Sequence, residues 1–213
     1  TGNWLLFLNS NVIVNQNIIT NYIKAIDSRP VKAYAGLVLY QSKDVQFEKY
    51  LNHYKRGLNS CKNNKSIHYK YLLFSNCLIS ADVFQYIDFN YKLKHYGGEE
   101  IDFAHRFQYK YPNQIFSAKD AIVSRTNVPS LEKYLHKLFE YGNKNLSSLS
   151  PELKKEILKF HFFMSPKKIS FFLVEFFSFC GLLLIKIPFL RCNYFIIRGL
   201  FLLTIIRGYY NIK

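Results

Sequence analysis

The chain has 213 residues, which is enough for one sizeable domain and an appendage. Hydrophobic residues make up 49% of it and aromatic residues 18%, a composition that excludes an intrinsically disordered chain. The formal net charge of +15 suits nucleic acid, anionic lipid or phosphorylated small molecules as partners. Nucleic acid is the weakest of these three, because the cations are scattered and no zinc-finger, basic-zipper or RNP-type signature occurs.

The hydrophobic pattern of the first 145 residues alternates between strand and helix periods. We expect strands at residues 4–8, 33–40 and 71–79, an apolar triplet at 12–14, and short strands at 115–116 and 121–123. We expect helices at residues 17–26, 81–87 and 130–143, the last capped by Ser130 and stopped by Gly142, with a polar excursion at 41–65. A further expected helix follows the segment 96–102 and ends at about residue 109. This alternation predicts an α/β fold.

The first of these strands, Trp4–Leu8, is of the buried type that needs a neighbour on both sides when it is parallel. The sequence opens directly into it. We therefore expect a preceding part of the domain that this sequence does not include.

Three carboxylates follow a pair of glycines within one short segment, Gly97-Gly98-Glu99-Glu100-Ile101-Asp102. Glycines permit a tight bend, and a helix start favours negative charge. Adjacent acids at such a place can deprotonate an incoming hydroxyl and hold it. On these residues alone, an acidic first helical turn without chemistry is the better interpretation.

Cysteine and histidine show no spacing typical of a metal site. The four cysteines have no CxxC pair, which disfavours metal or disulfide roles and fits a reducing cytosolic setting. Of the six histidines, His95 lies next to the acidic segment, where it could line a pocket or be a simple loop residue.

The last part of the chain is strongly apolar. Residues 169–190 are almost wholly apolar and aromatic, with the charged residues Glu175 and Lys186 among them, and residues 194–206 form a second apolar run. A membrane span needs roughly 20 apolar residues, so helices in the membrane interface or a shallow hairpin fit better than two spans. The alternative is a buried helical cap. A preceding lysine cluster suits anionic lipid: Lys154, Lys155, Lys159, Lys167 and Lys168.

Taken in order, these pieces resemble family 2 glycosyltransferases of the GT-A fold. The resemblance covers about residues 1–145, and each piece alone is weak. The first matching segment is Trp4-Leu5-Leu6-Phe7-Leu8-Asn9-Ser10-Asn11, where the family has a strand ending in Asp-x-Asp. A second is Gly97–Asp102, which is similar to the family's Gly-Gly-Glu-Asp motif. The remaining segments are Phe74–Ile79, Ala81–Asn90, and Ala121–Val123 with the helix at 130–142.

The resemblance implies an α/β fold that is a partial GT-A domain, Rossmann-like, with a mostly parallel sheet and flanking helices, followed by hydrophobic C-terminal helices. It implies a catalytic domain at residues 1–145 whose nucleotide-binding half precedes this sequence. A basic linker or helix at 146–168 and hydrophobic membrane-associated helices at 169–213 complete the expected organisation.

The resemblance also implies roles for individual residues in an inverting sugar transfer. By position Glu100 matches the family's base and Glu99 the acid that orients the sugars. Asp102 is a weaker acceptor-site candidate, because helix capping or an ion pair explains it equally well. Gly97 and Gly98 would let the backbone approach the acceptor. Asn76 would bind sugar hydroxyls with its amide or serve as a turn residue, and His95 is a further acceptor-site candidate.

Two departures from the family concern the donor diphosphate. Both Asp-x-Asp acids, which hold a divalent cation in the family, are amides here, Asn9 and Asn11. Neutral amide oxygens are weak ligands for Mn²⁺ or Mg²⁺. Where the family often has a His, this chain has Ser124-Arg125-Thr126. We therefore expect either a metal-dependent site or a metal-independent one in which Arg125 neutralises the diphosphate.

The resemblance implies an inverting glycosyltransferase that works with a nucleotide-sugar donor, and the apolar C-terminal part places it at the cytoplasmic face of a membrane in this hypothesis. The acceptor would be a glycan or a lipid-linked glycan in polysaccharide or glycolipid synthesis, and nucleic acid would not be a partner. The alternative is a catalytically inactive, membrane-bound protein that binds a glycan or another enzyme.

Overall fold

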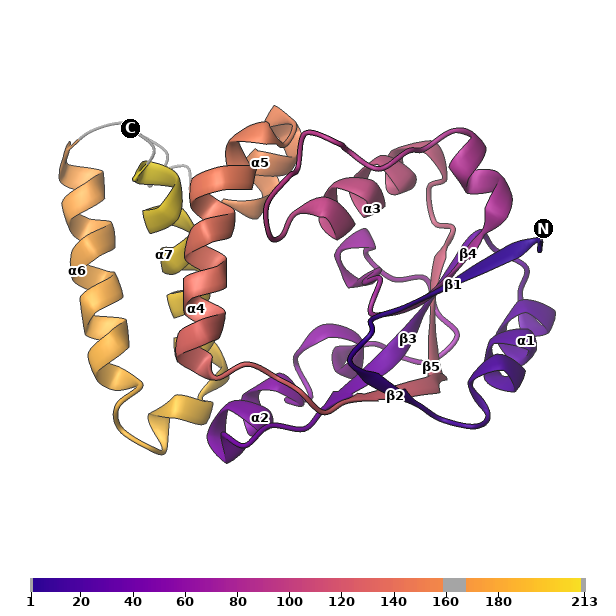
Figure 1. Ribbon diagram of the computed structural model, residues 1–213, viewed down its shortest axis with the longest axis horizontal. Helices are drawn as coiled ribbons and strands as arrows, with labels where there is room; N and C mark the ends of the chain where they lie inside the picture. Colours follow the sequence, from indigo (N-terminus) through magenta and orange to yellow (C-terminus); the bar gives the residue numbers. More distant parts are fainter. Residues whose placement is uncertain (1, 159–167, 212–213) are drawn as a thin grey trace. The chain divides into compact units, whose positions relative to one another are not determined.

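A five-stranded sheet with the order β1-β4-β3-β5-β2 organises the first of the two units into which the chain folds. The computed structural model describes residues 2–158 and 168–211 (Figure 1). The first unit comprises residues 1–43, 51–90 and 99–128, and the second comprises residues 44–50, 91–98 and 129–213. The strands are β1 (Trp4–Leu8), β2 (Val12–Val14), β3 (Ala33–Tyr40), β4 (Asn76–Ser80) and β5 (Ile115–Arg125).

The direction of the strands corrects the expected fold class. Three pairings are antiparallel, β1 with β4, β3 with β4 and β2 with β5, and only β3 and β5 are parallel. The prediction of a mostly parallel sheet is therefore wrong. The reason lies in the connections, because residues 9–11 reverse the chain between β1 and β2. Residues 41–75 return it to the end of the sheet at which β3 finished, so that β4 runs back without a crossover.

Helix α1 (Ile18–Ser28) covers part of this sheet. Its buried side chains Ile18, Tyr22 and Ala25 join a core cluster with Tyr34 and Val123 from the strands. These helix positions are spaced at one face of a helix, which is why the apolar period of the sequence located the element.

Helix α3 (Glu99–Lys110) is anchored in the first unit by aromatic side chains. Phe103 stacks on Phe84 and Phe89 with ring centroids 5.3 and 5.4 Å apart, and Phe74 contacts both Phe103 and Phe7 of β1. Phe103 is fully buried. This packing fixes the position of the acidic first turn of α3 relative to the end of β1.

The second unit is helical. It contains most of α2 (Val45–Leu51), α4 (Leu131–Glu140), α5 (Pro151–Ile157), α6 (Lys168–Leu184) and α7 (Tyr194–Tyr210). Helix α7 packs against both α4 and α6, and the three lie side by side in Figure 1. Of the expected lysine cluster, Lys154 and Lys155 lie on α5, and Lys159 and Lys167 lie outside the described residues.

The prediction of hydrophobic C-terminal helices also needs correction. Helices α6 and α7 form over the two apolar segments, but within the described ranges no helix is long and apolar enough to cross a membrane. Glu175 interrupts the first segment and Arg198 the second. Glu175 pairs with Arg207, the residue after the second segment, whose Nε lies 2.7 Å from Glu175 Oε1.

Candidate functional site

The acidic helix start is built on two glycines with left-handed backbone. Gly97 has a φ of 88° and Gly98 a φ of 101°, conformations that side-chain-bearing residues rarely adopt. A Cβ at Gly98 would also lie only 2.9 Å from the Tyr141 ring. Glu99 then opens α3, so that Glu99 and Glu100 occupy the first turn, where backbone N–H groups lack helical partners.

The surroundings of Glu100 change the pKa of its carboxyl group. Burial and the neighbouring charge of Glu99 raise the pKa of Glu100 to about 7, although the backbone N–H of Phe74 and the positive charge of Arg125 act in the opposite direction. A carboxyl with a pKa near neutrality is half ionised there, which suits a group that takes up a proton during a reaction. The same interactions show that Glu100 lies close to Phe74 and Arg125.

The turn after β1 lies between these two neighbours of Glu100. Leu8 is the sheet partner of Asn76, two residues beyond Phe74, and Val12 is the partner of Arg125. Paired residues in antiparallel strands have Cα atoms about 5 Å apart. Asn9 and Asn11, each one residue from such a pair, are therefore brought to the same end of the sheet as Glu100 and Arg125.

Arg125 carries an unused hydrogen-bond donor at this end of the sheet. Its Nε is buried and has no hydrogen-bond partner among the described residues, while its carbonyl oxygen accepts from the Gln41 N–H at 2.9 Å. A buried guanidinium donor without a partner is costly unless a ligand supplies an acceptor. Phosphate oxygens are the acceptors that a guanidinium group matches best.

The donor chemistry at this turn does not fit a divalent cation. Within residues 2–158 and 168–211 no group of three or more His, Cys, Asp or Glu side chains is placed to hold a metal. What the turn offers is the amides of Asn9 and Asn11 beside the positive charge of Arg125. Hard cations such as Mg²⁺ and Mn²⁺ bind carboxylates in preference to amides, and a neighbouring guanidinium opposes them.

Asn76 occupies a buried position in the sheet. Its Oδ1 accepts from the Tyr22 hydroxyl at 2.8 Å, and its Nδ2 donates to the carbonyl oxygens of Leu37 and Ala121 at 3.0 and 2.8 Å. The register of β3 and β5 shifts between Gly36 and Leu37, so the Asn76 amide bridges the strands where their own ladder is interrupted. Both amide N–H groups of Asn76 and one acceptor position of its oxygen therefore hold the sheet together.

Asp102 and His95 also take part in internal contacts. Asp102 is 5% exposed and lies 2.9 Å from Arg106 Nε, the ion pair that explains it without chemistry. His95 belongs to the second unit with Gly97, and the carbonyl oxygens of both accept from Asn145 Nδ2, at 2.6 and 2.7 Å. Asn145 thereby holds the backbone of residues 95–97 within the second unit.

Two groups near Glu100 were not identified from the sequence. The Phe74 N–H is a backbone group, and the residue type at position 74 does not indicate that this N–H interacts with Glu100. Cys77 is fully buried, and burial together with the charge of Glu100 raises the pKa of its thiol well above the usual range. Its place in the apolar run before Ile79 indicates a core residue, and no feature of the sequence joins it to Glu100.

Neither a protein-family model nor a curated protein matches this chain.

Proposed function

We propose that the chain is an inverting glycosyltransferase that moves a sugar from a nucleotide-sugar donor to an acceptor hydroxyl. The observation that carries the proposal is the environment of Glu100, a half-buried carboxyl with a pKa raised to about 7 at the start of α3, close to Arg125. The order of sequence motifs that resembles family 2 glycosyltransferases supports it.

In the proposed step, Glu100 removes the proton from the acceptor hydroxyl as its oxygen attacks the anomeric carbon of the donor sugar. The new C–O bond forms as the bond between the anomeric carbon and the diphosphate breaks, and the nucleoside diphosphate leaves with the electron pair. Attack from the face opposite to the leaving group inverts the anomeric configuration. Glu99, the adjacent acid, orients the sugar hydroxyls by accepting hydrogen bonds.

Arg125 supplies the positive charge that the leaving diphosphate needs. Its unpartnered Nε and its position beside the Asn9–Asn11 turn support this role. Electrostatic stabilisation of a leaving group by a fixed guanidinium requires no rearrangement during the reaction. The Asn9 and Asn11 amides add hydrogen-bond donors for the same oxygens.

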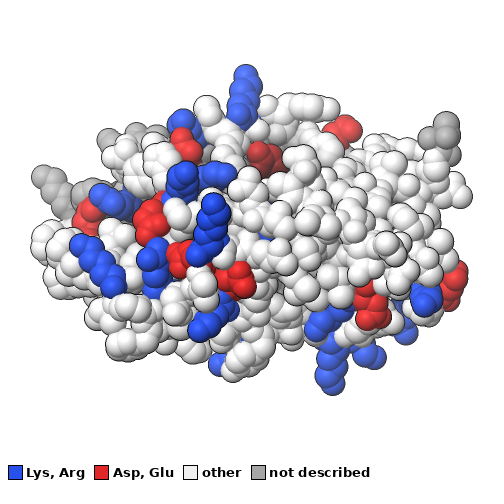
Figure 2. Space-filling view, turned by 60° about the horizontal axis from the view of Figure 1, so that its bottom comes forward, with Lys and Arg blue, Asp and Glu red and all other residues white. Residues whose placement is uncertain are grey.

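We infer in addition that the protein works at the cytoplasmic face of a membrane on a glycan or lipid-linked acceptor. Several aromatic side chains of the second unit are exposed, among them Phe172 at 69% and Phe189 at 72%. Exposed aromatic groups on an otherwise basic protein favour an anionic lipid surface. On the face shown in Figure 2, Lys and Arg lie among Asp and Glu, unlike the continuous basic stripe of a nucleic-acid-binding surface.

The test is transfer or hydrolysis of nucleotide sugars by the full chain, measured as release of nucleoside diphosphate across a panel of donors. We expect turnover by the natural sequence and its loss in Glu100→Gln, with the fold retained by circular dichroism. The matched control is Glu152→Gln, because Glu152 also lies in the first turn of a helix but belongs to the second unit. An unchanged rate in Glu100→Gln would remove Glu100 from the mechanism, and no turnover of any donor would favour the inactive glycan-binding alternative.

A further inference from the structure

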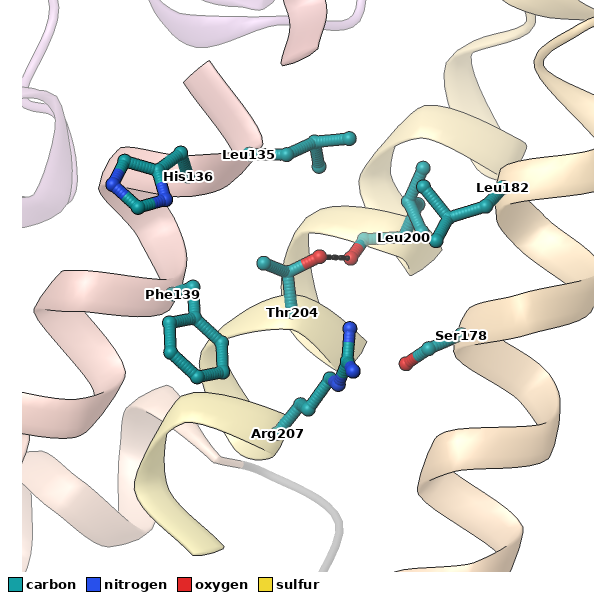
Figure 3. A pocket seen from close by; sticks show the side chains of 8 residues that line it. All are labelled: Leu135, His136, Phe139, Ser178, Leu182, Leu200, Thr204 and Arg207. Atoms are coloured by element: carbon teal, nitrogen blue, oxygen red, sulfur yellow. Dashed lines mark hydrogen bonds between the residues drawn. The ribbon is translucent and has the colours of Figure 1, made fainter. Parts of the chain in front are cut away.

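A cavity of about 280 Å³ lies within the second unit, between α4, α6 and α7 (Figure 3). Four apolar side chains from the three helices and four polar or charged ones share its wall. The lining residues are Leu135, His136, Phe139, Ser178, Leu182, Leu200, Thr204 and Arg207. Ligand sites in proteins combine apolar side chains, which bury part of the ligand, with polar groups that fix its orientation.

One polar group in the wall lacks a partner. Ser178 is 3% exposed, and its Oγ is buried without a hydrogen bond in the described part of the chain. Figure 3 shows this oxygen directed from α6 into the cavity. Thr204 differs, since its hydroxyl donates to the Leu200 carbonyl oxygen at 2.7 Å. A buried hydroxyl without a partner costs free energy that a ligand acceptor would recover.

The guanidinium group of Arg207 lies at the same end of the cavity as Ser178. Arg207 Nε donates to Glu175 Oε1 at 2.7 Å, which uses one edge of the guanidinium group and orients it. Figure 3 shows the group beside Ser178. A guanidinium has five N–H donors in a planar fork, so one pairing with a carboxylate leaves donors for a second anion. The apolar side chains Leu135, Leu182 and Leu200 lie on the other side of the cavity.

We infer that this cavity binds a single-chain amphiphile with an anionic head, either a carboxylate or a phosphate. The head accepts hydrogen bonds from Arg207 and Ser178, and the alkyl chain lies against the leucines and Phe139. The volume of about 280 Å³ is just below the range of about 300–1,000 Å³ that is usual for ligand pockets, which suits one alkyl chain better than two. All lining residues belong to the second unit, so the inference does not depend on glycosyl transfer.

The experiment is isothermal titration calorimetry of the full chain with monomeric decyl phosphate and decanoate, each below its micelle-forming concentration. Decyltrimethylammonium, with the same chain and the opposite charge, and inorganic phosphate alone are the comparison ligands. We expect both anionic amphiphiles to bind, and the cationic amphiphile and free phosphate to bind at least about tenfold more weakly, because head and chain must both be recognised. Equal binding of the cationic amphiphile would overturn the inference.

Variants locate the binding to the cavity. Arg207→Met should weaken binding of both anionic amphiphiles about tenfold, as expected for loss of a charge-assisted contact. The matched control is Arg198→Met, since Arg198 lies on α7 but packs over the Tyr194 ring and does not line the cavity. Because Arg207→Met also breaks the pair with Glu175, Ser178→Ala and the cavity-filling Leu182→Trp are measured too. We expect weaker binding in the first and none in the second, with unchanged circular dichroism.

A vesicle assay separates a lipid bilayer from the free amphiphile as the source of the ligand. Binding of the monomeric amphiphile that Leu182→Trp abolishes supports the cavity. Association that needs phosphatidylglycerol vesicles and is absent with the monomeric amphiphile would assign the effect to a surface and overturn the inference, as would unchanged binding in both Arg207→Met and Leu182→Trp.

Discussion

Glu100 links the proposed chemistry to the pH dependence of stability. The pKa of Glu100 is raised from an ordinary 4.5 to about 7 in the folded protein. The folded state therefore binds this proton more tightly than the unfolded state. The stability that it contributes is fully present below pH 4.5 and is lost as the pH rises through about 7.

We predict that Glu100→Gln is more stable than the natural sequence above pH 7, by at most roughly 3 kcal/mol, because glutamine carries no charge to bury. Below about pH 4.5 this difference should vanish. Urea unfolding at a series of pH values measures it. A Glu100→Gln variant whose advantage does not change between acidic and alkaline pH would show that Glu100 ionises as in water.

In the natural sequence, transfer should increase as the pH rises through about 7, because the base must be ionised.

Arg125 is expected to replace a metal ion. We predict that transfer by the full chain persists in EDTA and that Arg125→Met lowers kcat by about 10²–10³-fold, the range found when one preorganised electrostatic contact is removed. Arg29→Met is the control, since Arg29 belongs to the same unit but packs over the Phe116 ring. Steady-state kinetics with and without EDTA decide the matter: activity that EDTA abolishes and Mn²⁺ restores would contradict the prediction.

At the scale of elements, two glycines allow α7 to contact α4 and its continuation through backbone atoms. A Cβ at Gly142 would meet the carbonyl oxygen of Ile205, and one at Gly208 would meet that of Phe139. The sequence pattern predicts that Gly142 stops the preceding helix, but the chain continues in helical turns over Tyr141–Asn145. The residue is required for close helix packing, which a single sequence does not reveal.

We predict that Gly142→Ala lowers the free energy of unfolding by about 1–3 kcal/mol or more, because the added methyl group meets backbone that cannot rotate away. Gly199→Ala is the matched control. Its Cβ has open space around it on α7, so the change should be neutral or stabilising by up to about 1 kcal/mol. Chemical denaturation of both variants provides the comparison. Equal effects would mean that helix propensity, and not packing, decides the outcome.

The sequence predicts elements well where one local pattern decides them. Residues 33–40 form a strand with the expected bounds, and Ser130 caps α4 by accepting from the Lys133 N–H. It predicts less well where distant residues decide. The strands expected at 115–116 and 121–123 are one strand, because both segments pair with β3 on either side of a shift in register. Strand direction is likewise not encoded in an apolar run, and only the connections determine it.

The candidate site shows the same division. Glu99 and Glu100 could be predicted from the glycine pair and the acids that follow. The proximity of Arg125 to the Asn9–Asn11 turn depends on the pairing of Val12 with Arg125 across the sheet. No local pattern specifies that register, and the buried environment that raises the pKa of Glu100 has no counterpart in the sequence.

At the scale of the whole molecule, a net charge of +15 and exposed aromatic side chains predict binding to anionic membranes. Phe172→Ser with Phe176→Ser should reduce binding to phosphatidylglycerol vesicles several-fold, since each phenylalanine buries apolar area on the surface. The control is Tyr109→Ser, which removes a 74% exposed aromatic side chain from the first unit. Vesicle co-sedimentation at low and high salt measures the contributions of charge and of apolar contact to binding. Binding that is equal in the phenylalanine and tyrosine variants would contradict a role for α6.

The pairing of β1 and β2 has a consequence for the order of folding. These two strands are neighbours in the sequence, yet one pairs with residues 76–80 and the other with residues 123–125. During synthesis they emerge well before their partner strands. Their backbone groups can therefore form sheet hydrogen bonds only after β4 and β5 have been made. Because the turn between them carries Asn9 and Asn11, the diphosphate end of the proposed site would be among the last parts of the first unit to form.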